Sequence, residues 1–214
     1  MLIMDMNLFF RLSFFALWAL FGVVRGYYGR KTKTHSTIAG AMEKLKIAIA
    51  EEDMGTGFKI ITAIITAIGA AGLVLYLLSP PWWTWTSIPL GEWIQWSGVV
   101  ITLVPIFFLI WVHRHLDKQW SIALELREDH KLITTGPYRY VRHPMYLGVF
   151  TYTIGLMMIS LDVLVILFFA FTIWVNYRRI PREEQMLIQE FGDEYLEYIK
   201  RSGRLLPQFR RDQV

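Results

Sequence analysis

The sequence contains no cysteine and comparatively few charged residues. Its 214 residues include 5 His, and only 19% are Asp, Glu, Lys or Arg. The absence of cysteine excludes disulfide bonds, thiolate metal sites and a cysteine nucleophile, and it leaves the redox compartment undetermined. By contrast, 54% of the residues are hydrophobic and they occur in long blocks, which indicates a single integral membrane domain over residues 1–214.

The charge of the chain is modestly positive, with a formal net charge of +4. The basic residues lie beside the apolar blocks and form no continuous basic stretch. This distribution favours contact with anionic membrane lipids, and it predicts that nucleic acid is not a partner.

The apolar runs predict an all-α membrane protein with about five transmembrane helices. A bilayer core about 30 Å thick requires about 20 apolar residues in a helix. The last run covers about 33 residues, and Ser160-Leu161-Asp162 interrupts it with residues that suit a turn and a helix N-cap. We therefore expect a tight helical hairpin whose second helix continues past the membrane into residues 178–184. The predicted spans are residues 8–24, 58–78 and 93–112, and the two arms of 145–177.

Lysine and arginine are distributed unevenly among the connecting segments. They are frequent after the first and third spans and in the C-terminal tail, whereas residues 79–92 and the hairpin turn contain none. The positive-inside rule therefore predicts an outside N-terminus, a cytosolic C-terminus and a cytosolic active site. Residues 36–53 are predicted to form a cytosolic amphipathic helix. The first span could instead be a signal peptide, although Asp5 precedes its first basic residue and no small-residue cleavage site follows.

A first cluster of polar and aromatic residues covers residues 136–148. Pro144 suits the first turn of a helix, which places His143 near the N-cap. The free backbone N–H groups at such a position attract anions, and Tyr138 and Tyr146 could offer aromatic faces to a base or a cation. The alternative is an ordinary loop that enters a helix and packs at the membrane interface.

A second cluster starts about forty residues later with Arg179, Glu183 and Glu184. Its simplest interpretation is a solvated helix segment with charge pairs. Because the hairpin returns the chain to the same side of the membrane, Arg179 and Glu184 could instead line a site shared with the first cluster. The amphipathic segment 191–198 is predicted to cover this site. Its inward-facing residues would be Phe191, Tyr195 and Tyr198.

Other short patterns favour structural roles. His113, His115 and Asp117 could bind a metal ion, but polar residues after a span are far more common, so no metal is predicted. Gly55-Thr56-Gly57 follows no strand and is interpreted as a hinge and not as a nucleotide loop.

In combination, the two clusters resemble the superfamily of isoprenylcysteine carboxyl methyltransferases and phospholipid N-methyltransferases. The resemblance covers residues 130–207, and the catalytic and cofactor-binding portion of the chain is expected to be about 113–214. The matching positions are His130 to Ile133, Gly136-Pro137-Tyr138, Arg142 to Tyr146, Gly148, Arg179, Glu183-Glu184, Phe191-Gly192, Tyr195, Tyr198 and Leu206-Pro207.

The resemblance implies methyl transfer from S-adenosylmethionine to a lipophilic acceptor at the membrane, with S-adenosylhomocysteine as product. It implies that Arg179 and Glu184 are catalytic. Pro181 and Arg182 stand where carboxyl methyltransferases usually have acidic residues, so the acceptor stays open among a prenylated cysteine, phosphatidylethanolamine and an unrelated small lipid. The implied cofactor-binding residues are His130, Leu132, Ile133, Tyr138, His143, Pro144, Met145, Tyr146, Glu183 and Glu184.

Two other classes compete with this interpretation. Membrane reductases that use NADPH on a sterol or related alkene have a similar C-terminal His-Pro-x-Tyr pattern, but they are generally larger. A non-enzymatic scaffold or transporter is also possible, although the chain shows neither an internal repeat nor a pair of broken helices. The bound cofactor would distinguish the three classes.

Overall fold

A computed structural model describes residues 5–31, 56–116 and 132–208 of the chain. Within these ranges the regular elements are all helical, apart from two isolated bridges. The predicted amphipathic helix at 36–53 and the predicted site residue His130 lie outside the described residues. The elements are α1 (Met6–Lys31), α3 (Thr56–Leu78), η1 (Pro81–Thr86), α4 (Glu92–Leu116), η3 (Gly136–Arg139), α5 (Pro144–Ser160), α6 (Val163–Phe191) and α7 (Asp193–Arg201).

The described helices confirm the predicted all-α membrane fold. Four of them, α1, α3, α4 and α6, are long and apolar enough to cross a bilayer, and α5 is a shorter apolar helix of 17 residues. The described helices thus give four candidate spans, and the shorter helix α5 lies at the place of the remaining predicted span. As predicted, α6 extends beyond its apolar stretch and carries the second cluster on its last turns.

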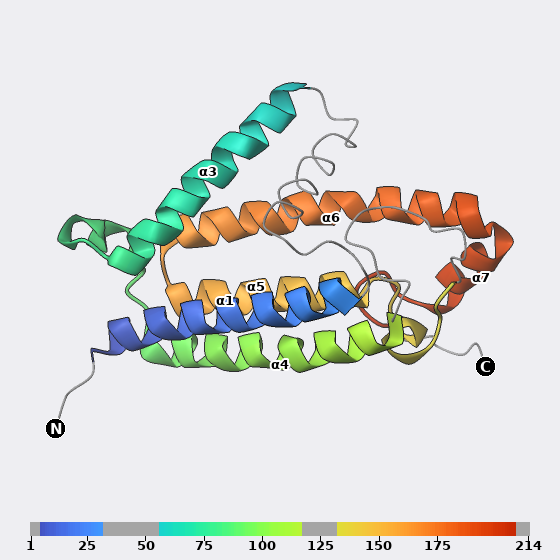
Figure 1. The fold of residues 1–214 in the computed structure, drawn as a ribbon, viewed down its shortest axis with the longest axis horizontal. Helices are drawn as coiled ribbons and strands as arrows, with labels where there is room; N and C mark the ends of the chain where they lie inside the picture. Colours follow the sequence, from blue (N-terminus) through green and yellow to red (C-terminus); the bar gives the residue numbers. More distant parts are fainter. Residues whose placement is uncertain (1–4, 32–55, 117–131, 209–214) are drawn as a thin grey trace.

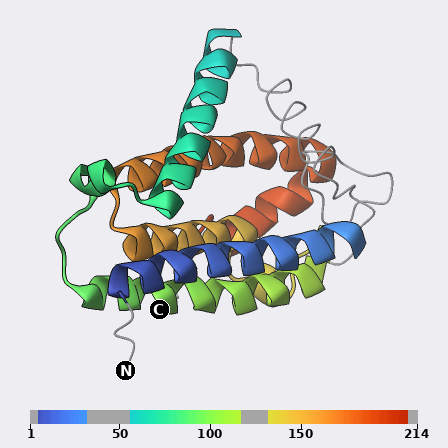
Figure 2. The ribbon, with the colours of Figure 1, turned by 60° about the vertical axis from the view of Figure 1, so that its left-hand side comes forward.

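The helices alternate in direction, which gathers both clusters at one end (Figure 1). α5 packs against α4, α1 and α6, while α3 contacts α6 and leans away from the other helices (Figure 2). α1, α4 and α6 run one way and α3 and α5 run the other way. The ends of α1, α4 and α6 therefore lie near the start of α5, η3 and α7. We call this end of the molecule the motif end.

The opposite end is fixed by the turn between α5 and α6. Leu161 adopts a left-handed conformation, and Asp162 caps α6 because its Oδ1 accepts a hydrogen bond from the Val165 N–H at 3.0 Å. Its Oδ2 accepts hydrogen bonds from Trp83 Nε1 at 2.9 Å and Thr86 Oγ1 at 2.5 Å. The predicted turn and N-cap are thus confirmed, and the same carboxylate attaches η1 to the hairpin.

The closest helix pair is α4 with α5, and small residues permit it. A Cβ atom on Gly155 would lie 2.3 Å from Thr102 Oγ1 and 2.7 Å from the Thr102 backbone nitrogen. The carbonyl oxygen of Gly98, also on α4, would lie 2.9 Å from the same Cβ atom. Close approach through small residues is a common means of pairing helices in lipid, where apolar burial between helices drives little association.

The Gly155→Ala variant is expected to be less stable, because the methyl group forces α4 and α5 apart. Overpacking of this kind costs about 1–3 kcal/mol. The expected result is a lower Tm of the detergent-purified protein. Gly72→Ala in α3 is the matched control, since a Cβ there meets nothing within 4 Å. An unchanged Tm for Gly155→Ala would contradict this description of the helix contact.

Candidate functional site

The first cluster forms a short turn that leads into α5. Gly136 has a φ of +59°, a backbone conformation that favours glycine. A Cβ atom on this residue would also overlap the ring of His115, so a larger residue would not fit. Pro144 occupies the first turn of α5 and His143 is the N-cap residue, as predicted. The side chain of His143 is only 3% exposed, so it points into the protein and not into solvent.

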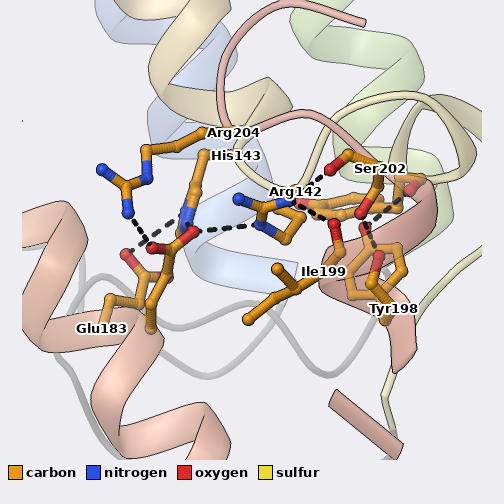
Figure 3. Close-up of polar contacts among 9 residues, drawn as sticks. Arg142, His143, Glu183, Tyr198, Ile199, Ser202 and Arg204 are labelled. Atoms are coloured by element: carbon orange, nitrogen blue, oxygen red, sulfur yellow. Dashed lines mark hydrogen bonds and ion pairs between the residues drawn. The ribbon is translucent and has the colours of Figure 1, made fainter. Parts of the chain in front are cut away.

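The chain that follows α7 pairs with this turn. The Arg142 N–H donates to the Gly203 carbonyl at 2.7 Å, and the Gly203 N–H donates to the Tyr140 carbonyl at 3.1 Å. The His143 N–H donates to the Arg204 carbonyl at 3.1 Å. We call residues 202–204 the C-terminal strap. It holds the backbone on both sides of Arg142 and leaves that side chain directed towards α6 (Figure 3).

Glu184 on α6 is the ionic centre of the site. Arg142 Nε donates to its Oε1 at 3.0 Å, and Arg204 donates from Nη2 to its Oε2 at 2.5 Å. His143 Nε2 lies 3.4 Å from Oε1 (Figure 3). The carboxylate is 8% exposed, so two guanidinium groups compensate a buried charge. Glu184 therefore connects the turn before α5, helix α6 and the C-terminal strap.

Arg142 also stabilises the end of α7. Its Nη1 donates to the carbonyl oxygens of Ile199, at 3.2 Å, and of Ser202. The Ser202 hydroxyl in turn donates to the Tyr198 carbonyl at 2.5 Å. One guanidinium thus satisfies carbonyls at the C-terminus of α7, where a helix leaves its last acceptors without partners.

The inner face of α7 is aromatic, as the sequence predicted. Tyr195 and Tyr198 are buried, and the Tyr198 hydroxyl donates to the Tyr138 carbonyl at 2.5 Å. Phe191, the last residue of α6, is half-buried. Burial raises the pKa of Tyr198 to about 12, and burial with the charge of Glu184 raises the pKa of Tyr195 further. Burial and the Glu183 carboxylate likewise raise the pKa of Tyr138. All three phenols are therefore neutral hydrogen-bond donors at physiological pH.

A second set of polar residues lies around Tyr146, which is on the first turn of α5. The hydroxyl of Tyr146 interacts electrostatically with Glu183 and Arg179, which lie four residues apart on α6 and share a face. Glu183 Oε2 lies 3.9 Å from His143 Nδ1, and the rings of His143 and Tyr146 are 5.7 Å apart. Arg179 and Glu183 thus reach the start of α5 beside the Glu184 network.

Three buried polar atoms in this region make no hydrogen bond within the described part of the chain. They are His143 Nε2, Glu183 Oε2 and the Tyr195 hydroxyl. His143 Nε2 has Glu184 Oε1 within ion-pair distance but not in hydrogen-bond geometry. Buried polar groups in proteins nearly always have partners, so these atoms are suited to contact a polar ligand.

The structure brings most of the predicted site residues together. Tyr138, His143, Tyr146, Arg179, Glu183 and Glu184 meet at the motif end, with Pro144 and Met145 on the same turn of α5. Leu132 and Ile133 lie half-buried ahead of η3. Within residues 5–31, 56–116 and 132–208, no three His, Asp or Glu side chains are arranged to hold a metal ion.

Sequence reasoning missed the partners of Glu184. Arg142 is among the matching positions but received no role, and Arg204 lies within residues 130–207 without being one of the matching positions. The available signal was that Arg204 comes shortly before Leu206-Pro207, which are among the matching positions. A sequence does not show, however, which carboxylate an arginine 20 residues away will contact.

A family profile matches the part of the chain that contains residues 136–148 and Arg179 to Glu184. The profile of the "Isoprenylcysteine carboxyl methyltransferase (ICMT) family" matches residues 98–189. The protein-S-isoprenylcysteine O-methyltransferase of Saccharomyces cerevisiae is 41% identical over 87 residues, which are 40% of this chain and 36% of that protein. The human enzyme of the same name is 40% identical over 84 residues, which are 39% of this chain and 30% of that protein.

The chain is also similar to a solved structure, that of the eukaryotic intramembrane Ras methyltransferase ICMT. The TM-score is 0.64 at 19% sequence identity, and the match covers 96% of this chain and 69% of that one. At that identity the likeness shows a shared fold. The aligned region spans about a third of the length of the curated relatives it matches. The matching profile and the similar relatives show that a segment of the chain is similar to the isoprenylcysteine carboxyl methyltransferase family, and the solved structure shows a shared fold.

Proposed function

We propose that the protein transfers a methyl group from S-adenosylmethionine to the carboxylate of a prenylated cysteine at the cytosolic membrane surface. The observation that carries this proposal is the convergence of both motifs on Glu184, within a segment similar to proteins named isoprenylcysteine O-methyltransferases. Membrane lipids surround the site, and a lipophilic or prenylated molecule is its proposed substrate partner.

The residues at the motif end fit a cofactor that is polar and carries several hydrogen-bonding groups. His143, Glu183 and Tyr195 offer buried polar atoms without hydrogen bonds in the described chain. Glu183 supplies a carboxylate suited to an ammonium or hydroxyl group, and Tyr138 and Tyr146 supply aromatic surfaces. When bound, S-adenosylmethionine supplies an electrophilic methyl group on a sulfonium. We assign its binding to these residues together with His130, Leu132, Ile133, Pro144, Met145 and Glu184.

The chain's own residues are proposed to orient the acceptor and to exclude water. A carboxylate is already ionised at neutral pH, so its methylation requires no general base. With S-adenosylmethionine held at this end, the carboxylate oxygen would take the methyl group as the carbon–sulfur bond breaks, which would neutralise both charges. Arg179 is the proposed catalytic arginine that orients the carboxylate by charge-assisted hydrogen bonds. The buried phenols of α7 keep this region dry, which strengthens electrostatic interactions.

The motif end is proposed to face the cytosol, with the N-terminus outside. Arginines concentrate at this end, whereas residues 79–91 at the opposite end contain no Lys or Arg. Because the chain has no cysteine, single-cysteine labelling is direct. A cysteine replacing the exposed Lys200 should react with an impermeant maleimide only in inside-out vesicles, and one replacing Thr84 only in right-side-out vesicles. The reverse pattern would invert the topology.

Calorimetric titration of the detergent-purified protein with S-adenosylhomocysteine tests the cofactor. We expect binding of this compound, loss of binding in Tyr146→Ala, and no binding of NADPH. Binding of NADPH alone would favour a reductase. Acceptor choice is tested separately with radiolabelled S-adenosylmethionine, where N-acetyl-S-farnesyl-cysteine should be labelled and phosphatidylethanolamine should not. The opposite labelling would assign phospholipid N-methylation.

A further inference from the structure

The short helix η1, at the end opposite the motif end, carries two exposed tryptophans. Trp82 is 59% exposed and Trp85 is 66% exposed. Side chains three residues apart lie on the same side of a 3₁₀ helix, so these two rings share one side of η1. Residues 79–91, which include η1, contain no charged side chain. We call Trp82 and Trp85 together the tryptophan face.

A second side of η1 is fixed to the hairpin between α5 and α6. Trp83 and Thr86 share this side by the same spacing, and both are buried and donate hydrogen bonds to Asp162. The Ile88 N–H donates to the Leu161 carbonyl at 2.7 Å, which adds a backbone link to the same turn. These contacts set the rotation of η1 about its axis, so the tryptophan face is held away from the hairpin.

The third side of η1 is smaller and more polar. Pro81 and Thr84 lie on it, and both are exposed. The Thr84 hydroxyl donates to the Pro81 carbonyl at 3.2 Å. The two exposed sides of η1 therefore differ, since one is aromatic and the other carries a hydroxyl group. A helix of this kind suits the boundary between lipid and water.

The position of η1 in the fold places it at such a boundary. It lies between the end of α3 at Leu78 and the start of α4 at Glu92, and both helices are candidate membrane spans (Figure 1). Leu78 and Trp93, which flank the connection, are also exposed apolar residues. The tryptophan face thus continues the apolar surfaces of two spans at the level where they leave the bilayer.

We propose that the tryptophan face binds lipid at the bilayer surface opposite the motif end. The rings lie at the level where the acyl chains meet the headgroups, and their Nε1–H groups donate to lipid ester carbonyls. Tryptophan is suited to this layer because its ring is apolar and its N–H requires a polar partner. This inference does not depend on methyl transfer, and it gives the membrane a specific contact site on η1.

The test uses single cysteines, since the chain has none of its own. Trp82→Cys, Trp85→Cys and Thr84→Cys are each labelled with a nitroxide, and the full chain is reconstituted in phosphatidylcholine vesicles. Paramagnetic resonance measures collisions of the label with dissolved oxygen, which concentrates in the bilayer, and with a water-soluble nickel chelate. The ratio of oxygen to nickel collisions should be severalfold higher at positions 82 and 85 than at position 84.

Two further labels calibrate this ratio. Val104→Cys, at an exposed position in the middle of α4, reports the hydrocarbon core, and Lys200→Cys reports water. Ratios at 82 and 85 that lie between these references support the proposal. Ratios equal to that at position 200 overturn it. Loss of both kinds of collision at 82 and 85, together with spin–spin broadening, also overturns it, because a second copy of the chain then covers the face.

The native rings are tested with lipids that are brominated near the headgroup end of their acyl chains. If Trp82 and Trp85 lie in this layer, the Trp82→Phe/Trp85→Phe variant loses emission that these lipids quench, so the quenched fraction of its fluorescence is smaller than in the wild type. An equal or larger quenched fraction overturns the proposal. If either cysteine variant fails to fold, the other gives the same comparison, because both positions belong to one face.

Discussion

Replacement of Arg179 by methionine is expected to lower kcat/KM for N-acetyl-S-farnesyl-cysteine by about 100- to 1000-fold. This is the scale of loss when one preorganised donor to a reacting oxygen is removed. Arg179 is half-buried on α6 and acts on the Tyr146 hydroxyl, so its guanidinium is placed beside the start of α5. The loss should appear in kcat/KM for the acceptor, and the affinity for S-adenosylhomocysteine should stay within about threefold of the wild-type value. Initial rates over a matrix of both substrate concentrations separate the two effects.

The adjacent Arg178 supplies the control. Its guanidinium lies 5.2 Å from the Trp174 ring centre and 5.9 Å from that of Phe58, so it joins α6 to α3 and points away from Tyr146. Arg178→Met should keep most of the activity, with a modest loss of stability from the cation–π contacts. Equal losses of kcat/KM in the two variants, with both proteins folded, would contradict the assigned role of Arg179.

The membrane fold was predictable because bilayer thickness sets the length of a helix. The spans and the hairpin were recognised from apolar run length, and the predicted turn at 160–162 coincides with the Asp162 cap of α6. Local chemistry also placed His143 at the start of α5, since Pro144 suits the first turn of a helix. The spans, the turn and the start of α5 each depend on a short stretch of sequence, which explains why they could be predicted.

The internal design of the site was less predictable, because it depends on contacts between distant segments. The sequence placed Glu184 among the catalytic and cofactor-binding residues, and both of its oxygens are engaged by arginines in the structure. Its neighbour Glu183 is more exposed, at 31%, and retains a buried oxygen without a hydrogen bond in the described chain. Adjacent glutamates in one motif thus have different surroundings, and only the fold distinguishes them. Direct contact of either with a cofactor stays a prediction.

Glu184→Gln is expected to reduce the stability of the protein, because this carboxylate holds three segments together. The substitution keeps the size of the side chain but removes the charge that compensates Arg142, whose side chain is 7% exposed. Removing one partner of a buried ion pair costs about 3–5 kcal/mol. Arg204 is 45% exposed and regains water, so the Arg142 contact should account for most of the loss. The measurement is the Tm in detergent, together with hydrogen exchange of residues 202–204.

A positioning role and a purely chemical role for Glu184 predict different patterns across variants. If Glu184 positions the turn, Arg204→Met should reproduce a weaker form of the same defect, with faster exchange at the Gly203 and His143 amides that join the strap to the turn. Glu190→Gln on the same helix is the matched control and should leave Tm nearly unchanged, because Glu190 is exposed. A Glu184→Gln protein with wild-type Tm and wild-type exchange, but without activity, would indicate that Glu184 acts in the chemistry and that other contacts hold the strap.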